Sequence, residues 1–322
     1  MITGASDLAQ YMALRSANSQ ASANFHTAAA TVSEGKIQDL RGALEANFKP
    51  LNAVQNALSR LDAYAEVTTQ ASFFMEQQQS ALGMISDLST SLAQDMVAAQ
   101  EAEATGTLDT IAESARSAFT QSIATLNSAA GGRYLFSGAN VVEAPLPAAE
   151  EMLSTLAVDI AGMSSSDAAT HIQSYFMDDA GGYAASYQGA EDDGIAFTIA
   201  SGQTVRSDLT ALSPDLRQSL AAMAIGALVS DADQAVSAGA DLLTGAHGIA
   251  DARGTLGVVQ ERIETVQTRN SATSTAMELR VAELTTPDMY EAASDLENYE
   301  MALERLYLVT SRMSAMNFAE YM

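Results

Sequence analysis

Apolar residues recur three and four positions apart along most of the chain, which is the spacing of one helix face. A sharp stripe runs from about residue 50 to residue 96 and predicts one helix of about fifty residues, roughly 75 Å long at 1.5 Å per residue. Thr105-Gly106-Thr107 then breaks the pattern, and a second stripe runs from Leu108 to Leu126. Because a short turn joins the two, we expect these helices to pack antiparallel.

Helical spacing returns after Pro214, and glycine-containing breaks are expected near residues 245–248. The cleanest stripe follows them and continues to Leu284. We expect it to form the core of a helical bundle through Leu256, Val259, Ile263 and Val266. Thr286-Pro287-Asp288 predicts the start of a last helix, with a capping hydroxyl, proline at the first helical position and an acid in the first turn.

The last helix has an apolar row of alternating three and four spacing and a second row at Ala302, Val309 and Met316. Residues 1 to about 45 form a helix-prone arm with few apolar positions. Neither has a local partner, so we expect the two ends to pair, and we expect the last helix to form an interface between subunits; the alternative is a helix docked within one monomer. The predicted interface residues are Leu8, Met12, Leu296, Tyr299, Leu303, Leu306, Met313 and Met316.

Two short stretches have the pattern of strands. Glycines bracket the run Tyr134-Leu135-Phe136, which is typical of a hairpin, and its motif residues are Gly132, Tyr134, Leu135, Phe136, Ser137 and Gly138. Ile195, Phe197 and Ile199 alternate ahead of a Ser-Gly turn and predict a second β-hairpin.

The predicted fold class is mainly α, a long antiparallel helical bundle with paired N- and C-terminal helices, short β-hairpins and a small inserted α+β domain. We expect residues 1–45 and 286–322 to form a coiled-coil assembly domain, and residues 46–139 and 213–285 to form the long-helix bundle. Residues 140–212, rich in Asp, Gly, Tyr and Ser, are the expected insertion.

Charge then limits the partners. Fifteen Lys and Arg against forty Asp and Glu leave a formal charge of −25, which repels nucleic acid and anionic membranes. The only two lysines, Lys36 and Lys49, lie in the first fifty residues. There is no cysteine, no apolar run long enough to span a membrane and no pattern of a cleaved signal peptide. If the protein is extracellular, we expect export by a leaderless route.

The candidates for chemistry are sparse. His26, His171 and His247 are isolated, and neither Asp178-Asp179 nor Glu191-Asp192-Asp193-Gly194 has the alternating ligand spacing of a calcium loop. The paired glycines lack the residues of a phosphate-binding loop. We therefore expect no catalytic residue, no metal and no cofactor.

Three stretches together resemble the flagellin family. Residues 253–264 resemble the segment that opens the family's conserved C-terminal region, and the last helix resembles its polymerisation helix. The stretch Gly132 to Gly138 is similar to the Tyr-Leu-Phe-Ser-Gly hairpin of the family's hook-associated members. Ser33-Glu34-Gly35-Lys36-Ile37 stands where the family usually has a Ser-Ser-Gly turn, but Gln38-Asp39-Leu40-Arg41 replaces the usual residues after it, which argues against an ordinary filament flagellin.

The resemblance implies a non-enzymatic structural subunit of the bacterial flagellum, an adaptor between hook and filament. It implies contacts with other copies in a ring, with a neighbouring hook-associated protein and flagellin, and with an export chaperone, and it implies type III export to the cell exterior. The alternatives are a filament-forming flagellin, a helical coiled-coil signalling module and, more distantly, an enzyme built on the insertion.

Overall fold

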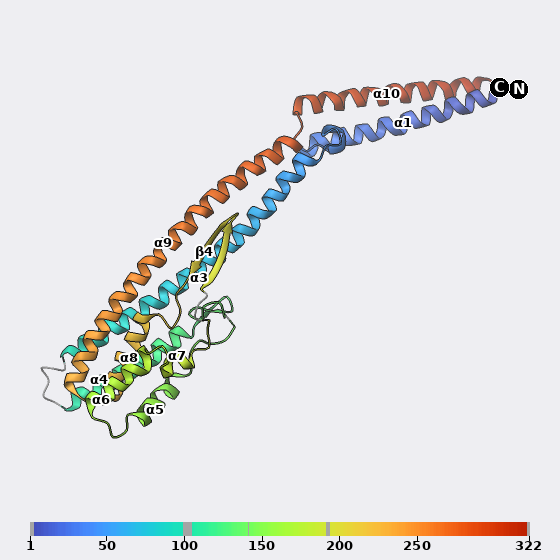
Figure 1. The fold of residues 1–322 in the computed structure, drawn as a ribbon. Helices are drawn as coiled ribbons and strands as arrows, with labels where there is room; N and C mark the ends of the chain where they lie inside the picture. Colours follow the sequence, from blue (N-terminus) through green and yellow to red (C-terminus); the bar gives the residue numbers. More distant parts are fainter. Residues whose placement is uncertain (1–2, 99–104, 141, 191–193, 321–322) are drawn as a thin grey trace. The chain divides into compact units, whose positions relative to one another are not determined.

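The computed structural model describes residues 3–98, 105–140, 142–190 and 194–320 (Figure 1). The chain forms two compact units, one of residues Met1–Arg60 with Ala272–Met322 and one of Leu61–Ser271. The division falls inside two long helices, α3 (Lys49–Ala98) and α9 (Ala232–Thr285). The domain boundaries expected at 45/46, 139/140, 212/213 and 285/286 stay predictions.

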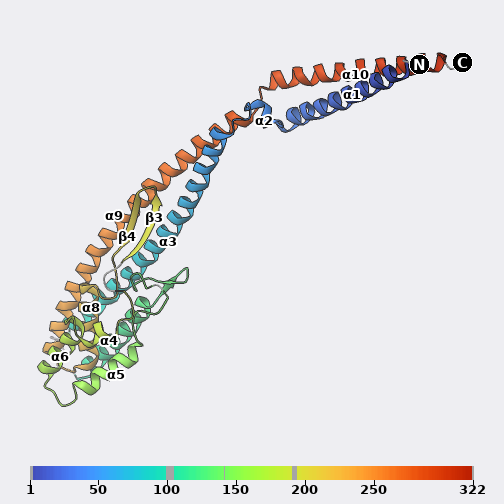
Figure 2. The same ribbon diagram turned by 45° about the vertical axis from the view of Figure 1, so that its right-hand side comes forward.

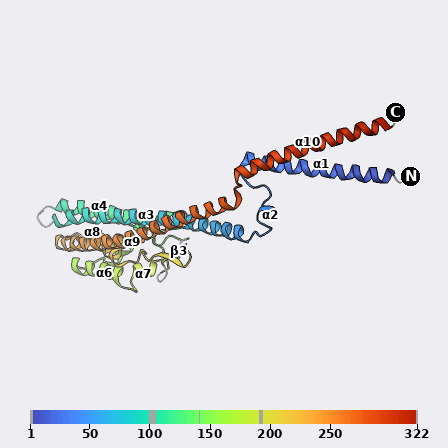
Figure 3. The ribbon, with the colours of Figure 1, turned by 90° about the horizontal axis from the view of Figure 1, so that it is seen from above.

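The first unit is built on two helices, α1 (Thr3–Glu34) and α10 (Met289–Glu320), which pack along each other. Both ends of the chain lie at the same end of this pair, so the helices are antiparallel (Figure 3). The predicted pairing of the N- and C-terminal helices is confirmed. Ala28 and Ala292 are its buried residues among the described side chains, and such small side chains let two helices approach closely.

A tight connection leads from α1 to α3. Gly35 ends α1 with φ +65°, and the N–H of Ile37 donates to the carbonyl of Thr285 at the end of α9. The short helix α2 (Leu40–Ala43) follows, and its N-cap Asp39 accepts from the N–H of Gly42. This connection is therefore an ordered turn.

The start of α10 differs from the prediction in its cap. Thr286 directly follows the last residue of α9, and its N–H donates to the carbonyl of Ala282 in the last turn of that helix. The capping side chain is instead Asp288, whose Oδ1 accepts from the N–H groups of Tyr290 and Glu291 at 2.9 and 3.3 Å. Pro287 thus precedes the helix and does not open it.

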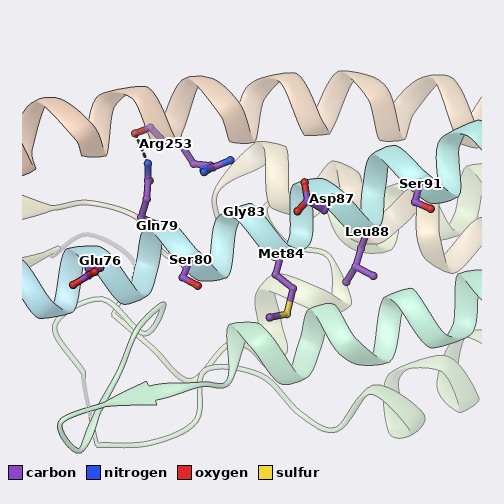
Figure 4. A pocket seen from close by; sticks show the side chains of 9 residues that line it. All are labelled: Glu76, Gln79, Ser80, Gly83, Met84, Asp87, Leu88, Ser91 and Arg253. Carbon is purple, nitrogen blue, oxygen red and sulfur yellow. Dashed lines mark hydrogen bonds between the residues drawn. The ribbon is translucent and has the colours of Figure 1, made fainter.

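The second unit contains most of the core. The predicted fifty-residue helix is confirmed as α3, and α4 (Thr105–Leu126) returns alongside it (Figures 1 and 4). α8 (Pro214–Leu228) is buried at every position from Leu216 to Ala227 except Gln218, because α4, α6 (Ser165–Met177), α5 (Ala149–Asp159) and α9 pack around it. The short helix α7 (Gly182–Ser186) packs on α6.

Both predicted hairpins are confirmed. The first joins β1 (Ala129–Ala130) to β2 (Arg133–Tyr134). The second joins β3 (Ile195–Ala200) to β4 (Gln203–Ser207) and lies beside α3 and α9 (Figure 2). Phe197 packs on Phe74 of α3, with ring centroids 5.7 Å apart.

The glycine breaks expected near residues 245–248 are wrong, because α9 is continuous from Ala232 to Thr285. A Cβ at Gly245 would collide with the hydroxyl of Ser219 in α8, and one at Gly248 would collide with the carboxylate of Asp215. These glycines are therefore contact points at which α8 and α9 approach each other closely, and they do not interrupt the helix.

Candidate assembly surfaces

α10 presents one apolar row to α1 and leaves another exposed. Leu296, Tyr299, Leu303 and Leu306 are half-buried along the pair. On a different face, Tyr290, Met301 and Leu308 are 87, 45 and 59% exposed. Their spacing of eleven and seven residues brings them to one side of a 3.6-residue helix. The sequence pattern predicted the first row and the flanking row at Ala302, Val309 and Met316, but not this second row.

The other predicted interface residues differ in their exposure. Met313 is half-buried, and Met12 is 61% exposed on α1, so within one copy Met12 does not contribute to the seam. Val309, from the predicted flanking row, is also exposed. The side chains of Leu8 and Met316 lie outside the described part of the structure. The role of all these residues in assembly stays a prediction.

The motif from Gly132 to Gly138 has an internal structural position. Gly131 and Gly132, at φ +59° and +79°, form the two-residue turn of the first hairpin. Leu135, Phe136, Ser137 and Gly138 are buried, and Tyr134 is half-buried. The carbonyl of Leu135 accepts from Gln78, and that of Phe136 accepts from the Tyr187 hydroxyl and the Ala211 N–H. The motif therefore joins α3 to the segments around residues 187 and 211.

The stripe on α9 faces the interior of the second unit. Leu256, Ile263 and Val266 are buried, and Val259 packs against the same cluster from a half-buried position. One turn further along, the buried Asn270 donates from Nδ2 to the carbonyl of Ile199 in β3, at 3.0 Å. This bond ties the second hairpin to α9.

A groove of about 730 Å³ lies between α3 and α9 in the second unit (Figure 4). The guanidinium of Arg253 lies over Gly83, where a Cβ would be 3.6 Å from Cζ, and Gln79 donates to the carbonyl of Arg253 at 3.5 Å. Glu76 and Asp87 are exposed on the α3 side. The lining contains one cation and two separate carboxylates, with no pair of groups in hydrogen-bond contact that would suit acid–base catalysis.

The histidines and acids of the described residues do not gather into one site. His171 Nε2 lies 3.9 Å from Asp159, His26 packs beside Phe25, and His247 is exposed. Glu191, Asp192 and Asp193 lie outside the described residues. Within the described residues no group of three or more His, Asp or Glu is arranged to hold a metal ion. No helix in that part of the chain is long and apolar enough to cross a membrane.

Comparison with known families identifies the C-terminal part of the chain. Residues 244–322 match the family described as the bacterial flagellin C-terminal helical region. The resemblance seen in residues 253–264 and in the last helix is thereby confirmed for this region. No curated protein matches the sequence.

Solved structures resemble a larger part of the chain. FlgL from Bacillus cereus matches with a TM-score of 0.52 and 14% identity, over 70% of this chain and 96% of that one. A putative flagellar hook-associated protein from Vibrio parahaemolyticus matches with a TM-score of 0.51 and 16% identity, over 74% of this chain and 97% of that one. The predicted fold class is confirmed, and the chain shares the fold of these flagellar proteins.

Proposed function

We propose that this chain is a structural subunit of the bacterial flagellum that joins the hook to the filament. The observation that carries the proposal is the double apolar surface of α10: one row packs on α1, while Tyr290, Met301 and Leu308 remain exposed. A helix with exposed apolar residues on a second side is typical of an element that packs between neighbours in an assembly. The flagellin C-terminal region and the FlgL-like fold support the flagellar setting.

The same likenesses favour a hook-associated subunit over a filament-forming flagellin, because the solved structures reported above are FlgL and a putative hook-associated protein. They also disfavour a signalling coiled coil or an enzyme. The subunit would contact other copies of itself, flagellin and a neighbouring hook-associated protein. We further propose export to the cell exterior without a cleaved signal, with a chaperone covering the exposed row of α10 before assembly.

A deletion strain tests the role. Cells lacking this protein should make hooks but release flagellin into the medium, and the wild-type gene should restore attached filaments. Leu303→Asp should fail to restore them, because it places an unpaired carboxylate in the seam between α1 and α10. Asn298→Asp adds the same charge at an exposed position of α10 and should restore them.

Electron microscopy of the cells and detection of flagellin in the medium give the readout. Normal attached filaments in the deletion strain would reject the proposal. Growth of long filaments from the purified protein alone would favour the filament-forming alternative.

A further inference from the structure

The connection between α1 and α3 holds exposed cations that form no ion pair with the described part of the chain. Residues 36–49, called here the cationic segment, contain both lysines of the protein and Arg41, against the two acids Asp39 and Glu45. Lys36, Arg41 and Lys49 are exposed. In the described residues, none of them forms an ion pair. The segment's backbone is nevertheless ordered by the Asp39 cap and by the bond from Ile37 to Thr285.

The first half of α10 has the opposite charge. Residues 289–304 contain five acids and no base. Glu297, Glu300 and Glu304, called here the acidic face, are exposed, and their spacing of three and four residues puts them on one side of the helix. Like charges at this spacing repel each other, and no described cation pairs with them.

Apolar side chains border the acidic face. Met301 lies within the same turn as Glu300 and Glu304, and Tyr290 and Leu308 continue its row to either side. A helix face that contacts only solvent gains no stability from this row of apolar residues. Exposed apolar residues next to a row of like charges are typical of a surface that binds a partner of opposite charge.

The cationic segment does not reach this face within its own copy. Because α1 and α10 are antiparallel, the segment lies near the start of α10 (Figure 3). Glu297 and Glu304 lie eight and fifteen residues beyond Met289, about 12 and 22 Å along the axis at 1.5 Å per residue. The segment instead shares a groove with Asp295 and Tyr299 of α10. At 100° per residue these two lie on the opposite side of the helix from the acidic face.

We propose that the cationic segment of one copy docks on the acidic face of α10 in a second copy. The inference rests on the proposed assembly function and names one of its contacts. Copies that each carry a charge of −25 repel one another, so self-assembly requires local attraction. Since the two surfaces are different parts of the chain, the contact is head-to-tail. Its repetition closes a ring when the rotations between successive copies add up to one full turn without a rise along the axis.

Charge reversal and its rescue test the contact in the full-length protein. Lys36→Glu, Arg41→Glu and Lys49→Glu together should lower the number of attached filaments at least about tenfold. Glu297→Lys, Glu300→Lys and Glu304→Lys together should do the same. A chain carrying both sets should recover most of the lost filaments. The charges of the two surfaces are then exchanged, and opposite charges again face each other.

The matched control reverses Arg116, Arg133 and Arg262 to glutamate. These cations of the second unit are exposed and form no ion pair within the described residues. The control set changes the net charge as much as the first set and should retain filaments. Circular dichroism and thermal unfolding of each purified variant show that it is folded, as expected from substitutions at exposed positions.

Cross-linking then identifies the partner. Since the protein has no cysteine, Arg41→Cys and Glu300→Cys chains carry one thiol each. Co-expressed in assembling cells and treated with a short bismaleimide, the two should give a mixed dimer of this protein. Either variant alone should not.

The inference is overturned if the combined reversal stays as defective as the single sets, or if the control set is equally defective. It is also overturned if the thiols cross-link only to another flagellar protein, or if each variant cross-links to itself. In these cases the proposed function still stands, provided that the deletion strain sheds flagellin and Leu303→Asp fails to rescue it.

Discussion

The hydroxyl of Ser207 donates a 2.7 Å hydrogen bond to the side-chain oxygen of Gln78, and the amide nitrogen of Gln78 donates at 2.7 Å to the carbonyl of Leu135. All three residues are buried. One side chain of α3 thus holds the end of the second hairpin and the exit from the first. In the core of the second unit, this amide is the link between both β elements and the long helix.

Gln78→Leu should destabilise the second unit by about 2 to 4 kcal/mol, because it leaves the buried Ser207 hydroxyl and the Leu135 carbonyl without their partner. Urea unfolding followed by circular dichroism measures the change. Gln55→Leu, at an exposed position of α3, is the control and should change stability by less than about 0.5 kcal/mol. Equal stability of the two variants would contradict the role given to Gln78.

The glycines of α9 should respond in opposite directions to the same change. Gly245→Ala should lower stability by about 1 to 3 kcal/mol, because its methyl group would overlap Ser219. At Gly254 a Cβ meets no atom within 4 Å, so Gly254→Ala should raise stability by about 0.5 to 1 kcal/mol through helix propensity alone. The melting temperatures of the two variants should therefore lie on either side of the wild type. A shift of both to the same side is the result that disagrees.

The turn of the first hairpin should accept asparagine more readily than valine. Gly131 has φ +59°, a left-handed conformation that a β-branched residue strongly disfavours. Gly131→Val should cost about 1 to 2 kcal/mol, whereas Gly131→Asn should cost a few tenths, since asparagine tolerates this conformation. Nothing lies within 4 Å of a Cβ there, so steric overlap does not confuse the comparison. Similar losses for both variants, measured by urea unfolding, would mean that the turn adopts another shape.

Tyr183 should make stability fall at alkaline pH. Burial raises the pKa of its hydroxyl well above the ordinary value of 10.0, and the nearby Arg217 offsets this only in part. Below pH 10 both the folded and the unfolded chain keep the hydroxyl proton, so Tyr183 makes its full contribution to the free energy of unfolding. Above pH 10 the unfolded chain releases it while the folded chain retains it, and the free energy of unfolding falls by up to about 1.4 kcal/mol per pH unit.

Tyr183→Phe should flatten this fall between pH 10 and 11.5, at the cost of the hydrogen bond to the Ala211 carbonyl. Tyr290→Phe, at an exposed position, should leave the profile as it is. Urea unfolding over a pH series provides the measurement, and an unchanged slope in Tyr183→Phe would show that another group controls it.

Periodicity was sufficient for the long helices and for the hairpins, because each depends on local spacing of apolar residues and on turn chemistry that the sequence displays. The prediction was wrong at Gly245 and Gly248. A glycine that ends a helix and a glycine that lets a neighbouring helix approach closely cannot be distinguished from the sequence alone. Only the position of Asp215 and Ser219 across the contact distinguishes them.

The capping side chain at α10 was misassigned for a related reason. Thr286 and Asp288 are both good caps, and which of them acts depends on where α9 ends. The buried role of Gln78 was beyond the sequence as well, because a polar residue in a long helix is ordinarily on its solvated side. The exposed row of Tyr290, Met301 and Leu308 was visible as a spacing, but its exposure depends on which side of α10 faces α1.

The contact between α1 and α10 joins segments separated by nearly the whole sequence. Closing so long a loop is slow, and α1 has few apolar residues with which to stabilise itself alone. The second unit, whose helices meet through nearer segments, should therefore fold first, and the α1–α10 pair last. In a subunit exported unfolded through a narrow channel, α10 would pair with α1 only after the second unit had folded. The order of folding would therefore delay the association of α10 with other copies.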